Sequence, residues 1–174
     1  PSFGKSFICI DNKNNNEFIK KIKVKNFYTY GTNSKSQFKI KKINQQKYFS
    51  EFDIDINLPG KKNTIIKNIK IPLLGLHNIR NATAAIAVSV SIGISKNIIK
   101  KSLKEFKGVQ RRFNKIFSYR ETEFYDDYAH HPSEIREVLS GVKEVYKKEE
   151  IICIFQPHRI SRLKDLKKEF SSSF

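Results

Sequence analysis

The sequence contains no tryptophan and no methionine, and only two cysteines occur among its 174 residues. Cys9 and Cys153 stand singly inside apolar runs, which predicts buried thiols in a reducing compartment and excludes a disulfide frame. No apolar run approaches the roughly 20 residues needed to cross a bilayer. The first residues also lack the apolar segment of a secretion signal. We therefore expect a cytoplasmic globular protein without membrane contact.

Acidic residues are also scarce, with 17 Asp and Glu against 34 Lys and Arg, so the formal net charge is +17. Such an excess can indicate a nucleic-acid-binding face. Here, however, the lysines are spread along the whole chain beside asparagine and isoleucine, and no basic-aromatic motif of a known nucleic-acid-binding fold appears. The pattern favours a solvated basic surface with no nucleic-acid partner, and a basic nucleic-acid-binding domain remains the non-enzymatic alternative.

The first part of the chain consists of short apolar or alternating runs that predict β-strands. We expect strands at 6–10, 27–30, 37–43, 47–56 and 64–73. An amphipathic stretch around Phe18, Ile19 and Ile22 predicts a helix after the first strand. An alanine-rich helix is then expected at 81–90, and Ser95 is suited to cap a second helix.

The segment 108–113 predicts a connector between two domains, 1–113 and 114–174. Beyond it the order of predicted elements is strand, helix, strand, helix, with Pro132 at the first position of the first helix. The apolar run 151–155 is typical of a strand that is covered on both faces. This order predicts parallel strands with a right-handed crossover.

Two clusters of polar residues follow the two predicted strands of the second domain. Residues 126–132 (DDYAHHP) come after the first strand, and residues 156–162 (QPHRISR) come after the second. Because the carboxyl ends of parallel strands meet at one rim of a sheet, we expect the clusters to lie side by side. Their arginines are suited to a carboxylate or a phosphate. The structural alternative is that Asp127 caps the following helix and the other charges are solvated.

Two further features are weaker taken alone. Asn78 and Asn81 share one face of a helical turn, and their amides match the donor and acceptor pattern of an adenine edge, although asparagine at a helix start is commonly a cap. Arg112 in the connector is placed to reach a phosphate when two domains close, unless it is simply a surface residue. Gly4-Lys5-Ser6 matches the end of a phosphate-loop pattern, but an apolar strand follows it instead of a helix, so we reject this match.

Taken in order, the segments 75–81 (GLHNIRN), 111–113 (RRF), 126–132 and 155–162 resemble the Mur ligases. The resemblance implies an α/β fold in which the later half of a central ATPase domain, with a mixed sheet and helices, precedes the first half of a Rossmann-like parallel α/β domain. It further implies that the phosphate-binding loop belongs to a missing upstream part. We therefore expect a fragment that is inactive alone.

The resemblance also implies a reaction, in which ATP and Mg²⁺ activate a substrate carboxylate as an acyl phosphate and an amine then displaces the phosphate. The segment 156–159 (QPHR) is similar to that of family members that join L-alanine to UDP-N-acetylmuramate during peptidoglycan synthesis in the bacterial cytoplasm. Ala129 stands where these alanine-joining members usually have a glycine. In this respect the loop resembles that of the murein-tripeptide recycling ligases of the same family, so such a recycling ligase is the alternative function. The Mg²⁺ ligands are expected mostly in the missing upstream part.

By the same resemblance, the ATP-binding residues are Asn78, Asn81, Arg112 and Asp127. The substrate-binding residues are Tyr128, His130, His158, Arg159 and Arg162. His130 is in addition our candidate to accept the proton of the attacking amine. A metal-dependent hydrolase built on Asp126, Asp127, His130 and His131 is a further alternative, although adjacent side chains on one short turn rarely converge on one ion.

Overall fold

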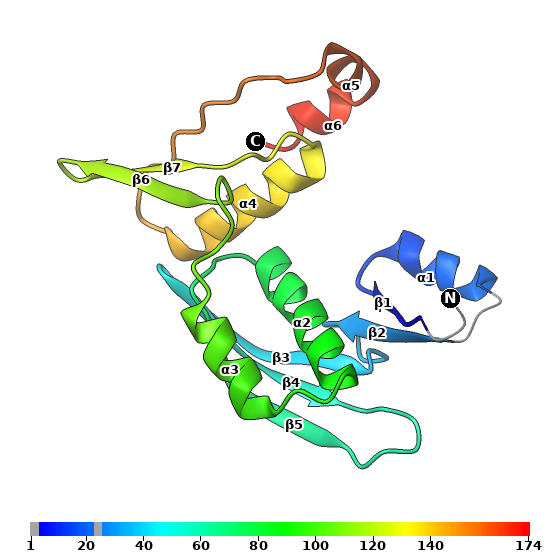
Figure 1. Ribbon diagram of the computed structural model, residues 1–174. Helices are drawn as coiled ribbons and strands as arrows, with labels where there is room; N and C mark the ends of the chain where they lie inside the picture. The colour runs from blue at the N-terminus through cyan, green and yellow to red at the C-terminus, as the bar shows by residue number, and fades with distance from the viewer. Residues whose placement is uncertain (1–3, 23–25) are drawn as a thin grey trace.

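The computed structural model describes residues 4–22 and 26–174, which form two lobes (Figure 1). The first lobe contains a mixed sheet in the order β1-β2-β3-β4-β5. Its strands are β1 Ser6–Cys9, β2 Phe27–Gly31, β3 Phe38–Gln46, β4 Phe49–Ile56 and β5 Thr64–Ile71. The first three strands run parallel to one another, and β3, β4 and β5 form an antiparallel meander. The strands predicted in this part of the sequence are therefore confirmed.

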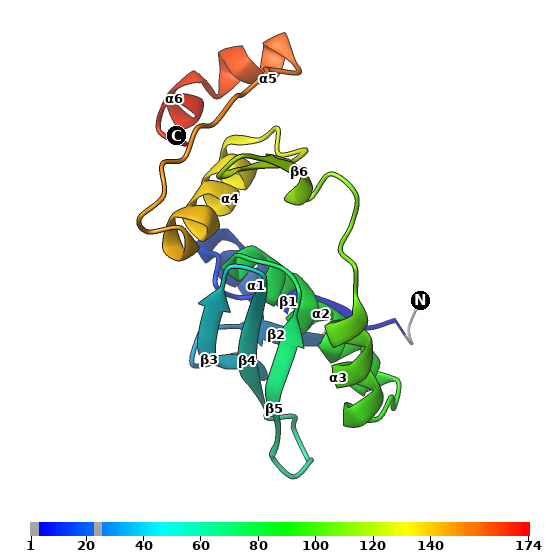
Figure 2. The ribbon, with the colours of Figure 1, turned by 90° about the vertical axis from the view of Figure 1, so that its left-hand side faces the viewer.

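Helices α2 and α3 lie side by side on one face of the strands β3, β4 and β5 (Figure 2). Helix α1 (Lys13–Lys21) connects the parallel strands β1 and β2. Helix α2 (Leu76–Ser91) packs against β1 to β4, and helix α3 (Lys96–Glu105) packs against β5. The predicted cap of α3 is confirmed, because the side chain of Ser95 accepts a hydrogen bond from the backbone of Ile98. Helix α2 begins five residues before its predicted start at 81, directly after a turn at Gly75.

The core of the first lobe lies between the sheet and α2. Its fully buried side chains include Phe38, Phe52 and Ile54 from the sheet, and Ile79 and Ile86 from α2. Full burial of each such side chain stabilises the fold by roughly 1.5–3 kcal/mol relative to exposure. Because Ile79 belongs to the first turns of α2, this packing fixes the segment 75–81 on the sheet.

The second lobe is a two-stranded hairpin and three helices. Strands β6 (Asn114–Tyr119) and β7 (Thr122–Asp126) pair antiparallel, and helices α4 (Pro132–Val145), α5 (Ile160–Asp165) and α6 (Lys167–Ser171) follow. Pro132 occupies the first turn of α4 as predicted and is fully buried. Strand β6 was not expected from the sequence.

The predicted strand at 151–155 is wrong. This segment is extended chain without a strand partner, and the side chains of Ile152 and Ile154 are 79% and 95% exposed. Within residues 4–22 and 26–174, the second lobe therefore contains no parallel strand pair. The buried state predicted for Cys153 is also wrong, because its thiol is exposed, whereas Cys9 is partly buried and burial raises the pKa of its thiol. An apolar run forms a strand only where a neighbouring strand supplies hydrogen bonds.

None of the helices described here combines the length and the apolar character that a membrane span requires. The mixed α/β architecture expected from the sequence is confirmed for the first lobe, and in the second lobe α6 contacts both α4 and α5 (Figure 1).

Candidate functional site

The two lobes touch where the glycine turn before α2 meets helix α4. A Cβ atom added to Gly141 of α4 would lie 2.9 Å from the Cα of Gly75, so the two backbones are in close contact. Gln45 at the end of β3 accepts a hydrogen bond from the N–H of Gly75 and donates one to the carboxylate of Glu144 on α4. This junction places the start of α2 directly beside the second lobe.

An arginine connects the lobes a short distance further along α2. The Nε of Arg80 donates to Asp11 at 2.8 Å, and its Nη1 lies 3.7 Å from the carboxylate of Glu137 on α4. Burial raises the pKa of Asp11, but the N–H of Thr32 and the guanidinium of Arg80 outweigh this effect and hold the pKa below its usual value. An ionised Asp11 therefore anchors Arg80 at the interlobe contact.

His77 lies at the same junction and was not among the residues singled out from the sequence. Its ring turns back on Gly75, since a Cβ added there would lie 2.6 Å from the ring carbon Cε1. Burial lowers the pKa of His77, the carboxylates of Glu137 and Asp127 oppose this shift, and the nearby Arg112 reinforces it. The Nδ1 atom is buried and has no hydrogen-bond partner among the residues described. The junction thus holds a buried ring nitrogen that has no partner within the described part of the chain.

The two predicted adenine-binding asparagines lie on the first turns of α2, beside His77. Asn78 is half-buried and donates from Nδ2 to the carbonyl of Leu74, whereas Asn81 is exposed. The N-cap of α2 is Gly75 and makes no side-chain cap bond, so neither asparagine caps the helix. The bond to Leu74 uses one hydrogen of the Asn78 amide and leaves the other available for a ligand.

Asp127 ties the interdomain connector to the loop after β7. Its Oδ2 accepts a hydrogen bond from the N–H of Phe113 at 2.7 Å, and its Oδ1 accepts one from the N–H of Ala129 at 2.6 Å. The alternative that Asp127 caps α4 is wrong, because the N-cap is His131, whose ring nitrogen accepts from the N–H of Ser133. Asp127 therefore fixes Arg112 and the loop 128–131 relative to each other.

Glu134, in the first turn of α4, also contacts two of the predicted residues. Its Oε1 lies 3.8 Å from Nη2 of Arg112, and its Oε2 accepts a hydrogen bond from the N–H of His130 at 3.1 Å. Burial raises the pKa of Glu134, but the hydrogen bond from the His130 N–H and the guanidinium of Arg112 outweigh burial and lower the pKa. The ionised carboxylate thus bridges a predicted ATP-binding residue and a predicted substrate-binding residue.

Tyr128, in the loop after β7, and Arg111, in the connector, contact each other. The guanidinium of Arg111 stacks 4.7 Å from the centre of the Tyr128 ring and pairs with Asp126 at 3.3 Å. The backbone N–H of Tyr128 donates to the carbonyl of Arg111. The Tyr128 ring also meets the edge of the His130 ring at a centroid distance of 4.9 Å. These contacts hold Tyr128 against the connector.

The second predicted cluster reaches this site through one residue. Nη1 of Arg162 on α5 donates to the carbonyl of His130 at 3.1 Å. His158 and Arg159 are exposed, and in the parts of the chain described neither forms a hydrogen bond or ion pair with the other candidates. The prediction that the two clusters lie side by side on one rim of a parallel sheet is therefore wrong for the described residues, because the second lobe has only the antiparallel pair β6-β7 and Arg162 alone contacts the first cluster.

The four residues of the hydrolase alternative do not converge. Asp126 pairs with Arg111, Asp127 accepts two backbone N–H groups, and His131 caps α4. Across residues 4–22 and 26–174, no group of three or more His, Cys, Asp or Glu side chains is arranged to hold a metal ion. The geometry therefore gives no support to a metal-dependent hydrolase.

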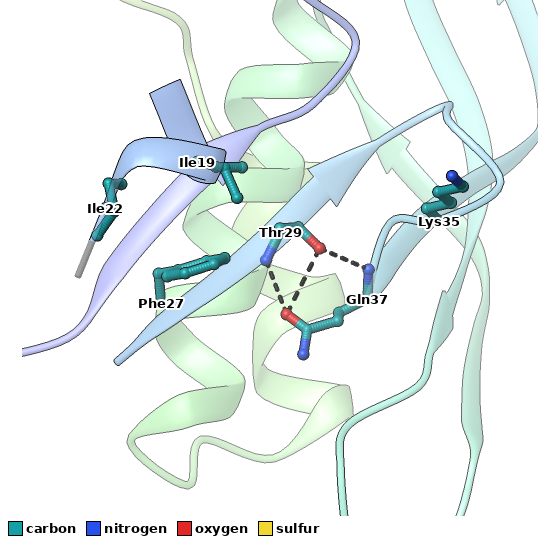
Figure 3. A pocket seen from close by; sticks show the side chains of 6 residues that line it. All are labelled: Ile19, Ile22, Phe27, Thr29, Lys35 and Gln37. Carbon is teal, nitrogen blue, oxygen red and sulfur yellow. Dashed lines mark hydrogen bonds between the residues drawn. The ribbon is translucent and has the colours of Figure 1, made fainter. Parts of the chain in front are cut away.

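A separate hollow of about 550 Å³ lies on the face of the sheet that α1 covers (Figure 3). It is lined by Ile19, Ile22, Phe27, Thr29, Lys35 and Gln37. Thr29 and Gln37 bond to each other, since Gln37 Oε1 accepts from the Thr29 N–H and the Gln37 N–H donates to Thr29 Oγ1. None of the predicted site residues lines this hollow. It is therefore separate from the interlobe site, by which we mean the predicted residues near the junction of α2 and α4.

Family models match both lobes of the chain. Residues 1–89 match the Mur ligase middle domain, and residues 111–174 match the Mur ligase glutamate ligase domain. The chain belongs to the Mur ligase family. The interlobe site is thus built between parts of two Mur ligase domains.

Curated relatives of this Mur ligase chain extend over its full length. It is 75% identical to the UDP-N-acetylmuramate–L-alanine ligase of Pelagibacter ubique and 39% identical to that of Bartonella quintana, in each case over all of this chain. The chain spans 38% and 37% of the length of these two relatives. Each of these relatives is more than twice as long as this chain, and its named activity is that of the longer protein.

Solved structures share the same fold. The UDP-N-acetylmuramate–alanine ligase MurC of Thermotoga maritima matches with a TM-score of 0.65 at 36% identity, covering 80% of this chain and 32% of that chain. MurF of Acinetobacter baumannii matches with a TM-score of 0.65 at 22% identity, covering 84% of this chain and 30% of that chain. The α/β fold class expected from the sequence is confirmed.

Proposed function

We propose that this chain is part of an ATP-dependent, ADP-forming ligase that joins L-alanine to the carboxylate of UDP-N-acetylmuramate. The observation that carries the proposal is the 75% identity, over the whole chain, to a Pelagibacter ubique protein of that name. The product would be a peptidoglycan precursor, and the bacterial cytoplasm is the compartment that we propose.

The chemistry requires activation of a poor electrophile. Transfer of the terminal phosphoryl group of ATP to the carboxylate gives an acyl phosphate and ADP, and Mg²⁺ would offset charge on the phosphates. The amine of alanine then attacks the acyl carbon, a C–N bond forms, and the tetrahedral intermediate collapses with loss of phosphate. The described side chains supply no cluster of carboxylates for Mg²⁺, so its ligands would come from elsewhere in the complete enzyme.

The residues on the α2 side of the junction suit the nucleotide. Asn78 and Asn81 would bind adenine, Asp127 would accept hydrogen bonds from the ribose hydroxyls, and Arg112 would approach the terminal phosphates. The charges of Asp127 and Arg112 both act on the pKa of His77, the residue before Asn78, and this proximity supports a single nucleotide site at the interlobe junction. An ionised carboxylate accepts about four hydrogen bonds, so the two backbone amides on Asp127 leave room for a ribose.

The residues beyond β7 suit the acid and the amino acid. Their proposed substrate-binding members are Tyr128, His130, His158, Arg159 and Arg162. The contact of Arg162 with the carbonyl of His130 supports a common site for these two residues. His130 would accept the proton that the ammonium group of alanine must lose before it attacks.

A murein-tripeptide recycling ligase is the second candidate, favoured by Ala129 in the loop after β7. A chimera tests both functions. This chain would replace the matching 38% of the Pelagibacter ubique relative, and formation of ADP and amide would be measured with L-alanine and with the tripeptide. Alanine-dependent turnover supports the proposal, tripeptide-dependent turnover supports the second candidate, and no turnover with either rejects both.

A further inference from the structure

Glu134 connects the two halves of the proposed site, and nothing in the sequence motifs drew attention to it. It occupies the third position of α4, between the buried Pro132 and the buried Ile135. Its two carboxylate oxygens face different partners, Oε1 the guanidinium of Arg112 and Oε2 the backbone N–H and ring of His130. The side chain is 34% exposed, so it lies at the surface of the site and not in the core.

We propose that Glu134 is a positioning residue, which holds Arg112 toward the nucleotide phosphates and His130 toward the reacting amine. The proposal rests on the ligase function proposed above. Glu134 would touch neither ATP nor alanine. It would influence the reaction only by orienting Arg112 and His130.

The charged groups around Glu134 agree with this role. Arg112 approaches it from the connector, the His130 ring Nδ1 lies 3.7 Å from Oε2, and Arg162 of α5 donates to the carbonyl of His130. Arg111, also in the connector, is already engaged by Tyr128 and Asp126. Glu134 is thus the carboxylate that pairs with Arg112 among the residues described.

The contact to Arg112 matters because an unpaired arginine carries large conformational freedom. Fixing a long side chain on substrate binding costs conformational entropy, and prior orientation by a carboxylate lowers that cost. Together with Asp127, which ties the backbone of Phe113 to the loop after β7, Glu134 would fix both the backbone and the guanidinium of the connector. The nucleotide would then meet a preformed site.

A purely structural role predicts different behaviour. A Glu at the third helical position commonly accepts a hydrogen bond from a backbone N–H that precedes the helix, as in a capping box, and Gln performs this task as well as Glu. Glu134→Gln therefore keeps the bond from the His130 N–H and removes only the negative charge. Glu134→Ala removes both.

Measurements on the 174-residue chain separate these roles without any ligase assay. We expect Glu134→Gln to leave the thermal midpoint and the backbone amide signals of α4 unchanged. The heteronuclear NOE of the Arg112 Nε–H group should fall, because the guanidinium loses its partner. An Arg112 signal that is as ordered in Glu134→Gln as in the wild type would overturn the proposal.

Steady-state kinetics of the chimera supply the second arm. Glu134→Gln should lower kcat/KM for ATP about tenfold, whereas the exposed Glu150→Gln, which removes the same charge, should leave it unchanged. In an Arg112→Ala background the Glu134→Gln substitution should cost less than about twofold, because its main target is gone. Equal costs in both backgrounds, or no cost in either, would reject a role through Arg112.

The two arms keep this proposal separate from the proposed function. An unsubstituted chimera without turnover rejects the ligase function of the segment, and the Arg112 NOE then decides alone whether Glu134 orients the arginine. Turnover that is insensitive to Glu134→Gln upholds the ligase function and rejects the positioning role.

Discussion

At the scale of single residues, the site combines side chains that the motifs predicted with two that they did not. Asp127, Arg112 and His130 are held in place by backbone amides and by Glu134, and the ring of His77 lies against Gly75 at the start of α2. A helix-capping role was open for Asp127 on sequence alone, but the cap belongs to His131. Which polar side chain caps a helix depends on where the chain turns, and spacing alone does not determine this.

Arg159 is expected to matter for its place in the loop and not for its charge. In the chimera, Arg159→Ala should impair use of the acid or amino acid far more than Lys167→Ala, which removes one charge at the start of α6. A charge-assisted bond from a guanidinium to a carboxylate contributes roughly 1.5–3 kcal/mol, so kcat/KM should fall about ten- to a hundredfold. Equal losses in steady-state assays would contradict the assignment of Arg159 and favour a general effect of positive charge.

His77 should make the stability of the first lobe depend on pH. Burial lowers the pKa of His77 in the folded state below the value of about 6.5 that an unfolded chain shows. The unfolded state then binds the proton first as the pH falls, so the contribution is fully present above about pH 6.5 and is lost as the pH falls through the folded pKa.

The test compares the wild type with His77→Leu, which has no titrating nitrogen. Urea denaturation at pH 8, 6.5 and 5 should show a smaller loss of unfolding free energy toward acid in the variant. The same acid-dependent loss in both proteins would show that His77 is not responsible.

At the scale of elements, helix α4 is the structural link between the lobes. It presents Gly141 to the glycine turn before α2, Glu137 to Arg80, and Glu134 to the connector. Its position at the site follows from the close approach of two glycines, which permits backbones to touch. Neither glycine was given a role from the sequence.

Gly141→Ala should loosen the contact between the lobes. Alanine favours a helix by roughly 1 kcal/mol over glycine, but the added Cβ would lie 2.9 Å from the Cα of Gly75, and overpacking costs roughly 1–3 kcal/mol. We expect a net loss of unfolding free energy in urea denaturation. The neighbouring exposed Ser140→Ala is the matched control and should not destabilise. A Gly141→Ala variant that is more stable than the wild type would refute this contact.

At the scale of the whole molecule, two lobes that match parts of two Mur ligase domains meet where the glycine turn at Gly75 contacts Gly141 of α4. The division of domains after residue 113 stays a prediction, since Phe113 packs against a cluster that contains Leu74 of the first lobe and Val142 and Tyr146 of the second. The net charge of +17 is spread over the molecule, and the site uses only a few of its arginines.

The chain by itself should neither hydrolyse ATP nor form amide bonds. Catalysis of phosphoryl transfer depends on a loop whose backbone and lysine hold the phosphates, and residues 1–174 contain no complete phosphate-loop pattern. Alanine-dependent release of phosphate by the purified 174-residue chain, measured against a reaction without alanine, would overturn this expectation.

The sequence alone was enough to predict the family and the strands of the first lobe, because these depend on short motifs and on local periodicity. The pairing of strands, the exposure of 151–155 and the bridging contacts of Glu134 and His77 were decided by tertiary structure. An apolar run forms a strand only where another strand can pair with it. A carboxylate such as that of Glu134 contacts two partners only when folding brings both of them, here Arg112 and His130, close to its oxygens. Both conditions depend on residues far apart in the chain.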